Sequence, residues 1–243
     1  MLEIYKDPKV IFELSEKELL GAKSIGKKTV KEIIDSKNNT LIEKHIKFME
    51  KNYIDIISIN EKEYPKNLKE IYDPPISLYI KGNKKILNEK NIAIVGCREA
   101  SNYGINAAKY FAYNLSKEKV NIVSGLAKGI DSFAHIGSLI AYNEKKMNCG
   151  KTIAVLGNGI DFIYPQENVE IAKKILKSDG AIISEYPLGS KPNKINFPAR
   201  NRIISGISKS IIVIEAKERS GTLITVDFAL EQGRDVFVVP RKY

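Results

Sequence analysis

The strongest constraint on the fold is an alternation of short apolar runs with segments of helical period, beginning near residue 90. Several of the apolar runs are continuous, which is typical of strands buried on both faces. Between them, apolar residues recur at helical spacing, as at Ile105, Ala108, Phe111 and Leu115. The predicted strands are Ile92–Gly96, Asn121–Ser124, Thr152–Leu156, Ala181–Ser184, Ser210–Glu215 and Val236–Val239. Strands that alternate with helices across short connections predict a parallel sheet covered on both faces.

We therefore expect an α/β fold, with an extended Rossmann-like, mostly parallel sheet over residues 89–243 and helices on both of its faces. Residues 1–60 predict a small helical domain, with a Ser15-x-x-Glu18 capping box and a turn at Gly26. This segment resembles a hairpin-helix-hairpin or SAM-like element, although a plain helical turn explains it as well. Prolines break the chain between the two, so residues 61–88 are expected to form a linker or extension with a short strand over Ile76–Ile80.

Composition places the chain among globular proteins. The hydrophobic fraction is 43%, and no apolar run approaches the ~18 residues of a membrane span. The N-terminus has no secretory signal pattern. Cys97 and Cys149 are too few for a disulfide framework, and no Cys/His group has zinc-ligand spacing. We expect a cytoplasmic protein with no membrane segment and no bound metal.

The net charge of +10 is unevenly distributed. Residues 1–89 hold 17 lysines against 15 acidic residues, whereas residues 90–243 hold 22 Lys or Arg against 14 acidic residues. Every arginine lies in the second part. A basic surface can bind polyanions by neutralising phosphates. The lysines are explained equally well by a general bias of composition, so charge alone does not decide the function.

Ligands of open α/β sheets bind at the carboxyl ends of the strands, where four glycine-bearing loops of this chain are expected to meet. Glycine lets a ligand approach the backbone, an arginine can fork onto phosphate, and helix N-termini favour anions. A glycine at such a turn is more often a backbone requirement than a ligand contact, so only the set together predicts a phosphate-binding edge. The candidate residues in these loops are Gly96, Arg98, Ser124, Gly125, Lys128, Gly129, Ser220, Gly221 and Thr222.

The usual nucleotide-binding and catalytic motifs are missing. No loop matches the dinucleotide fingerprint or a Walker sequence, so no nucleotide cofactor is expected. His135 and His45 are isolated on helical segments, where a histidine is usually packed rather than catalytic. Asp131, Asp161 and Glu215 are helix caps or loop braces before they are acids or bases, and no Ser/His/Asp group is evident.

The most specific basic segment surrounds Phe197-Pro198-Ala199-Arg200-Asn201-Arg202. Basic groups with aromatic side chains among them suit single-stranded nucleic acid, because phosphates follow the cations and bases stack on the rings. The candidate residues here are Lys191, Lys194, Phe197, Arg200, Asn201 and Arg202. In the alternative interpretation, Arg200 or Arg202 pairs with a carboxylate such as Glu185 or Glu215.

Taken in order, the motifs VGCR, SGLAKGIDSFAH, TIAVLGNGIDFIYP, SEYPLG, FPARNRIISG, SGTLIT and GRDVFVVP resemble the DNA-processing protein A (DprA/Smf) family. The likeness covers roughly residues 60–240. It implies an extended Rossmann fold that binds single-stranded DNA without sequence preference, with duplex DNA bound more weakly. It also implies loading of the RecA recombinase during transformation, a homodimer, and no enzymatic activity or cofactor.

By this resemblance, Arg98 matches the arginine of the family's Gly-Ser-Arg loop. The glycine turn of residues 125–131 and the Arg200-Asn201-Arg202 segment match two further motifs. Cys97 departs from the family by replacing a serine. Residues 143–150 are longer than the usual connection, and the chain is expected to be shortened at its C-terminus, without a winged helix.

Two other functions are compatible with the sequence. Ser220-Gly221-Thr222 is faintly similar to the loop of Rossmann-like phosphoribohydrolases, although it lacks their doubled glycine. A nucleotide sensor coupled to the N-terminal helices is the second alternative.

Overall fold

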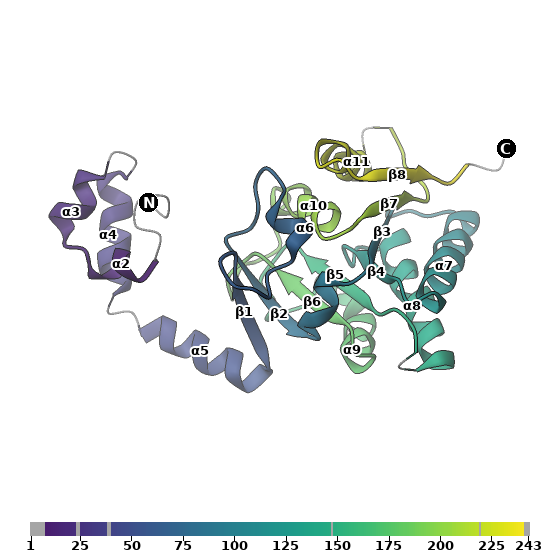
Figure 1. Cartoon of the computed structure of the whole chain (residues 1–243), viewed down its shortest axis with the longest axis horizontal. Helices are drawn as coiled ribbons and strands as arrows, with labels where there is room; N and C mark the ends of the chain where they lie inside the picture. The colour runs from purple at the N-terminus through teal and green to yellow at the C-terminus, as the bar shows by residue number, and fades with distance from the viewer. Residues whose placement is uncertain (1–7, 23–24, 38–39, 147, 219, 241–243) are drawn as a thin grey trace. The chain divides into compact units, whose positions relative to one another are not determined.

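The computed structural model of the chain describes residues 8–22, 25–37, 40–146, 148–218 and 220–240 (Figure 1). The chain divides into two compact units, residues 1–52 (unit 1) and residues 53–243 (unit 2). No helix in these described ranges combines the length and the apolar character needed to cross a bilayer.

Unit 1 is the predicted helical segment. Its capping box is confirmed: Glu18 N donates to Ser15 Oγ (3.4 Å), and Ser15 N donates to Glu18 Oε2 (2.8 Å). A helix begins directly after Gly26, as predicted, and the apolar centre of the unit includes the buried Leu19 and Val30. The likeness to a SAM-like element stays a prediction. The helices are α2 (Pro8–Glu13), α3 (Glu16–Gly21), α4 (Lys27–Ser36) and α5 (Thr40–Asn52).

Unit 2 is built on one eight-stranded sheet of order β1-β2-β6-β5-β4-β3-β7-β8. The six strands from β6 to β8 in this order pair in parallel, whereas β1 and β2 are antiparallel to their neighbours. The strands are β1 (Ile54–Ser58), β2 (Ser77–Gly82), β3 (Asn91–Val95), β4 (Asn121–Ser124), β5 (Thr152–Leu156), β6 (Ala181–Ser184), β7 (Ser210–Val213) and β8 (Asp235–Val238). The predicted mostly parallel α/β sheet is confirmed.

Helices cover both faces of this sheet (Figure 1). The α-helices of unit 2 are α6 (Lys66–Lys69), α7 (Asn102–Lys117), α8 (Ile130–Lys145), α9 (Val169–Lys177), α10 (Asn196–Gly206) and α11 (Gly221–Glu231). Short 3-10 helices are η1 (Lys84–Asn88) and η2 (Gln166–Asn168). Because side chains alternate along a strand, Ile94 packs with α7 and α8 on one face, while Ala93 and Val95 belong to the cluster with α6 and α10 on the other.

The six strands predicted from apolar runs are confirmed as β3 to β8, within two residues of their predicted ends. Strand β1 was not predicted. Only Ile54 and Ile57 of this strand are buried, and a spacing of three is more typical of a helix than of a strand. The sheet edge therefore carries a strand without the pattern by which the others were found.

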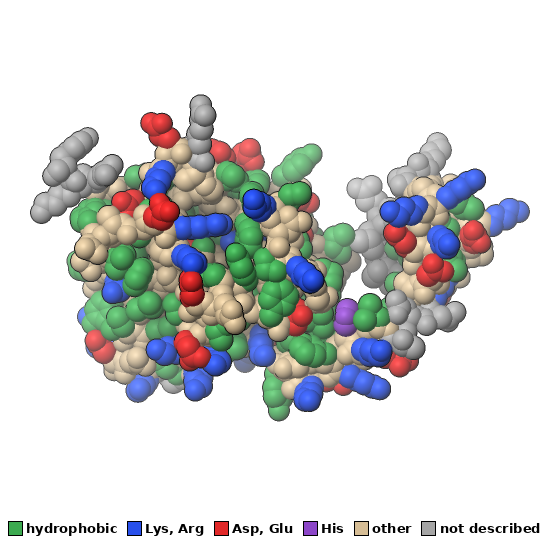
Figure 2. Space-filling model, turned by 180° about the vertical axis from the view of Figure 1, so that it is seen from behind, with side chains coloured by type: hydrophobic (Ala, Val, Ile, Leu, Met, Phe, Trp, Pro, Cys, Tyr) green, Lys and Arg blue, Asp and Glu red, His purple; other side chains and the backbone are tan. Residues whose placement is uncertain are grey.

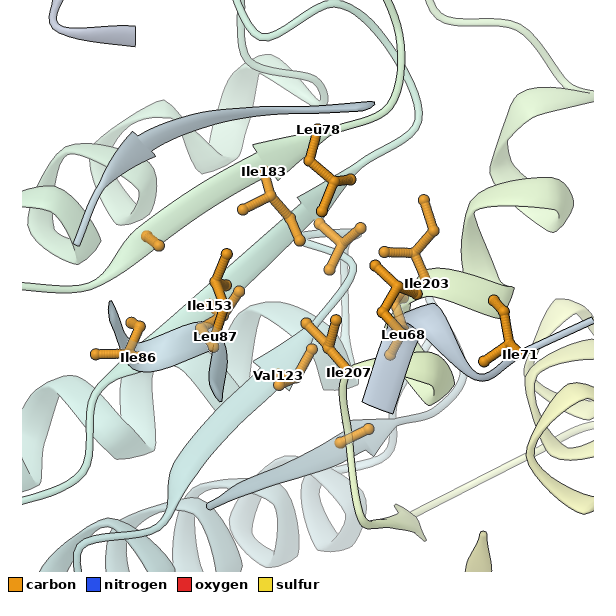
Figure 3. Packing of buried hydrophobic residues seen from close by; sticks show 14 of the residues in the cluster. Leu68, Ile71, Leu78, Ile86, Leu87, Val123, Ile153, Ile183, Ile203 and Ile207 are labelled. Atoms are coloured by element: carbon orange, nitrogen blue, oxygen red, sulfur yellow. The ribbon is translucent and has the colours of Figure 1, made fainter. Parts of the chain in front are cut away.

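Residues 53–88 belong to unit 2 rather than to a helical domain or a linker. Strands β1 and β2 complete the sheet, and α6 packs on α10, with Leu68 fully buried. Figure 3 shows Leu68 and Ile71 beside Ile203 and Ile207 of the α10 region, with Leu78 of β2 in the same cluster. The contact is close: a Cβ built on Gly206 would lie 2.6 Å from Leu68 Cδ1. The boundary between the units thus falls after Asn52, not near residue 60.

This placement predicts that Leu68→Ala lowers the free energy of unfolding of the whole of unit 2. Truncating a fully buried leucine costs about 2–5 kcal/mol, since the cavity is only partly filled by relaxation. Urea denaturation followed by circular dichroism measures the change. If residues 61–88 were a linker, the variant would unfold at the same urea concentration as the parent chain.

Candidate functional site

A pocket of about 530 Å³ opens at the carboxyl ends of β3 and β7. These strands are neighbours in the sheet, but β4 to β6 follow β3 on one side while β7 lies on the other. Such a reversal of strand order leaves a crevice between the outgoing loops, and it is where α/β sheets bind ligands. The pocket walls come from the loop after β3, from α10 and from the start of α11.

Nine of the fifteen site residues predicted from the sequence line this pocket. They are Gly96, Arg98, Lys194, Phe197, Arg200, Asn201, Ser220, Gly221 and Thr222. Six do not line it: Ser124, Gly125, Lys128, Gly129, Lys191 and Arg202. The geometry of each group explains the division.

Arg98 is an exposed cation of the pocket. Its guanidinium carbon lies 5.8 Å from the centroid of the Phe197 ring, and it forms no hydrogen bond or ion pair within the described ranges. The loop that carries it packs tightly on Gly129, which has a φ of +75°. A Cβ at Gly129 would lie 2.4 Å from the carbonyl oxygens of both Cys97 and Arg98. Gly129 therefore sets the path of the Arg98 loop without lining the pocket.

Phe197 and Tyr164 form an aromatic wall. Their rings stack with centroids 5.7 Å apart and an interplanar angle of 26°. Tyr164 is about half exposed, and both residues line the pocket. The exposed Lys194, three residues before Phe197, lies along the same lining. Tyr164 was not among the predicted site residues, because it lies well beyond the end of β5 and follows no glycine directly.

Arg200 is buried beneath the pocket rather than presented in it. Its side chain is 5% exposed, and Nη1 donates to Gly125 O (2.9 Å) and to Val155 O. Burial lowers the pKa of Arg200 to about 10, while the neighbouring Asp131 carboxylate opposes this shift. Arg200 is thus a cation of the pocket floor whose hydrogen bonds are already directed at backbone carbonyls.

Asp131 accepts hydrogen bonds from backbone amides of the loop after β4, the loop that the sequence analysis predicted to bind phosphate. Its Oδ2 accepts from Gly125 N (3.1 Å) and Ala127 N (3.4 Å), and burial raises its pKa while Arg200 opposes the shift. Ser124 is also turned inward, because its Oγ donates to Ile94 O (2.7 Å). The glycine turn after β4 is therefore braced from within. The expectation of Asp131 as a loop brace agrees with this geometry.

Arg202 lies outside the pocket in a network of ion pairs. Its Nη atoms donate to both carboxylate oxygens of Glu185 (2.8 and 2.6 Å), and Nε lies 3.1 Å from Asp73 Oδ2. The Arg202 side chain is only 10% exposed, so little of its guanidinium faces solvent. The alternative interpretation from the sequence, in which Arg202 pairs with Glu185, agrees with this geometry. The periodicity of α10 explains it, since residues 200 and 202 point in different directions.

The two predicted site lysines that do not line the pocket, Lys128 and Lys191, are exposed. Lys128 pairs with Glu167 (2.8 Å), and Lys191 lies in the loop before α10. On the face shown in Figure 2, Lys and Arg side chains are interspersed with acidic and hydrophobic ones rather than gathered into one patch. On this face, therefore, charge alone does not mark out a site.

The start of α11 forms another side of the pocket. Ser220 is its N-cap residue but makes no capping hydrogen bond, and its buried Oγ has no partner within the described ranges. Asn201 joins this segment to α10, because its Nδ2 donates to Gly221 O (3.1 Å). Thr222 is buried in the first turn. This helix end thus has an unpartnered, buried hydroxyl, and of its first-turn amides Leu223 N already donates to Ser220 O (3.0 Å).

Two charged residues at the rim were missed by the sequence analysis. Glu99 and Lys217 both line the pocket, and Lys217 Nζ lies 2.6 Å from Glu99 Oε2. They follow neighbouring strands that are far apart in the sequence, so no local motif links them.

His135 and Cys97 are buried and hydrogen-bonded within the fold. His135 is fully buried, its Nδ1 lies 2.7 Å from Thr152 Oγ1, and burial lowers its pKa to about 3. Burial raises the pKa of the Cys97 thiol, which donates to Glu99 O. Among the residues that the structure describes, no three His, Cys, Asp or Glu side chains cluster as metal ligands.

Comparisons with known proteins agree on one family. The family model described as DNA recombination-mediator protein A matches residues 55–243. DNA processing protein DprA of Streptococcus pneumoniae is 46% identical over 183 residues, which cover 75% of this chain and 62% of the relative. DNA processing protein DprA of Bacillus subtilis is 44% identical over 188 residues, which cover 77% and 61%. The chain therefore spans about three fifths of the length of these curated relatives.

Two solved structures are similar throughout most of the chain. The X-ray structure of DNA processing protein A from Streptococcus pneumoniae has a TM-score of 0.81 at 37% identity, over 94% of this chain and 76% of that one. DNA processing protein A from Helicobacter pylori has a TM-score of 0.69 at 30% identity, over 78% of this chain and 81% of that one. The latter structure concerns the single-stranded DNA binding mode of that protein.

The buried His135 predicts a loss of stability on acidification. Its pKa is about 3 when folded and near 6.5 when unfolded, so between these values the unfolded chain binds a proton that the folded chain does not. The contribution of His135 to the free energy of unfolding is fully present above pH 6.5, and below that pH the free energy of unfolding falls by up to about 1.4 kcal/mol per pH unit. His135→Asn should flatten this dependence, as measured by urea unfolding at pH 7, 6 and 5. Parallel pH dependences for the two chains would contradict the assignment.

Proposed function

Because the chain belongs to the DNA recombination-mediator protein A family, we propose that it binds single-stranded DNA in the pocket beside Arg98 and Phe197. The family resemblance found in the sequence is thereby confirmed. The relative from Helicobacter pylori supports the choice of ligand, since its structure concerns single-stranded DNA binding. Membership also supports a mediator of recombination as the general role.

One observation carries the proposal: an exposed arginine and a stacked aromatic pair share a single pocket. Arg98 supplies a free guanidinium for a backbone phosphate, and the ring wall of Phe197 and Tyr164 supplies a surface for a base. Every base has a flat face, so stacking of this kind tolerates any sequence. In a duplex the bases already stack on one another, so we expect duplex DNA to bind more weakly.

The start of α11 is a second group suited to bind the backbone phosphate. The α11 macrodipole is positive at this end, and the Gly221 and Thr222 amides form no hydrogen bond within the described ranges. Lys194 adds an exposed cation to the pocket lining. In this arrangement Gly96, Gly221 and Thr222 shape the wall, and Asn201 holds α10 against α11.

The buried residues have a supporting part. Arg200 and Asp131 keep the strand-end loops in place, and Gly125 and Gly129 allow those loops to pack closely. Lys128 and Lys191 are exposed beyond the pocket lining, where they can meet phosphates farther along a strand. Arg202 and Ser124 contribute to folding rather than to the ligand.

Family membership supports a proposal for the wider role as well. We place the chain in the cytoplasm as a homodimer that hands single-stranded DNA to the RecA recombinase during DNA uptake. We propose that it is not an enzyme. This is supported by the inward-facing His135 and by the carboxylates of the pocket, since Asp131 accepts from backbone amides and Glu99 pairs with Lys217.

Arg98→Ala is predicted to weaken binding of every short single strand, whatever its sequence. Losing one charged phosphate contact should reduce affinity about tenfold or more at low salt, and should lower the slope of log K against log salt by about 0.7. A salt titration by fluorescence anisotropy, with a single strand and its matching duplex, measures both. A folded Arg98→Ala chain with unchanged affinity would refute the proposal.

Arg202→Met is the matched control, because it removes an arginine two residues beyond the buried Arg200. It should lower the free energy of unfolding by about 3 kcal/mol, the lower end for a broken buried pair, since the Glu185 side chain keeps 26% exposure. Its folded fraction should bind single strands as the parent chain does.

Phe197→Leu is predicted to weaken binding while leaving the salt dependence intact. Loss of base stacking costs about 1–3 kcal/mol, and the number of phosphate contacts does not change. The same titration therefore separates the aromatic contribution from that of Arg98. A change in slope equal to that of Arg98→Ala would show that Phe197 only positions the arginine.

A further inference from the structure

We propose that Lys217 is a phosphate ligand held in reserve by Glu99, and that a bound strand takes it from that carboxylate. This inference rests on the proposed function and adds to it a residue that tunes affinity. Lys217 Nζ and Glu99 Oε2 are 2.6 Å apart, and both residues line the pocket. The pair spans the rim, from the loop after β3 to the segment before α11.

The position of Lys217 fits a phosphate contact. Its backbone carbonyl accepts a hydrogen bond from Ser220 N (3.2 Å), so the lysine is one short turn away from the start of α11. Glu99 directly follows Arg98 in the sequence. Lys217 is therefore linked to both groups assigned to the backbone phosphate: through Glu99 to the loop that carries Arg98, and through Ser220 to the α11 N-terminus.

The pair is suited to exchange rather than to stabilising the fold. The side chains of Lys217 and Glu99 are 64% and 84% exposed, and exposed ion pairs contribute little to stability. The hydrogen bond between them raises the pKa of Lys217 and lowers that of Glu99, so both remain charged at neutral pH. A phosphate can replace the carboxylate with no loss of pairing for the lysine.

Glu99 differs from the other pocket carboxylate in what it faces. Asp131 is buried against Arg200 and backbone amides, so its charge is balanced within the fold. Glu99 is balanced by a lysine at the surface of the pocket. Each strand that binds must therefore displace Glu99 or leave Lys217 unused, and Glu99 lowers the affinity in either case.

The test compares Glu99→Gln, Lys217→Gln and the double variant in the salt titration with a short single strand. Glu99→Gln should bind about 2- to 5-fold more tightly at low salt, because the lysine is no longer held. Lys217→Gln should bind more weakly, with a slope smaller by about 0.7. The double variant should match Lys217→Gln, since the gain depends on the lysine.

Glu170→Gln is the matched control. Glu170 pairs with Lys173 at 2.7 Å on α9, away from the pocket lining, and its loss removes the same charge from the chain. It should leave affinity unchanged. A gain from Glu99→Gln that persists without Lys217 would overturn the inference, because Glu99 would then act only by repulsion, as would no gain at all.

The two proposals fail differently. If the parent chain shows no salt-dependent binding of single strands, the proposed function falls, and this inference falls with it. If the parent chain binds and Arg98→Ala weakens it, but Glu99→Gln behaves like the parent, only the reserve role of Lys217 is lost.

Discussion

The site depends on the buried Arg200 and the carboxylate of Asp131. Arg200 ties α10 to the loop after β4 and to β5, and Asp131 holds the amides of that same loop from α8. A buried charge is costly unless it is paired and hydrogen-bonded, so this arrangement tolerates few alternatives. These hydrogen bonds hold α10 at a fixed position above the sheet, and α10 in turn places Phe197 beside Arg98.

The parallel sheet could be predicted because its strands carry their own signal. Strands buried on both faces are continuously apolar, and turn residues separate them from helices of clear period. Strand β1 had no such signal, because an edge strand that buries only Ile54 and Ile57 does not need one. The predicted domain boundary was wrong for the same reason. Residues 53–88 join unit 2 through tertiary packing, such as that of Leu68, which leaves no periodic pattern in the sequence.

The site could be predicted only to the level of its loops. Glycine-rich strand ends pointed to the edge of the sheet where the pocket lies, but not to the direction of each side chain. Arg200 and Arg202 look alike in the sequence, but Arg200 bonds to carbonyls 45 and 75 positions away, whereas Arg202 pairs with carboxylates 17 and 129 positions away. Tyr164, Glu99 and Lys217 were missed because their neighbours in the pocket are distant along the chain.

The two arginines of α10 have a mechanical consequence. Arg200 fastens the helix to the sheet beneath it, while Arg202 fastens it to Glu185 and, through Asp73, to the segment that bears β1 and β2. A helix anchored in two directions is restrained from sliding or tilting when a ligand binds. Under the proposed function a bound DNA strand must adjust to α10 rather than α10 to the strand, so we expect a flexible chain to fit this surface more readily than a stiff one.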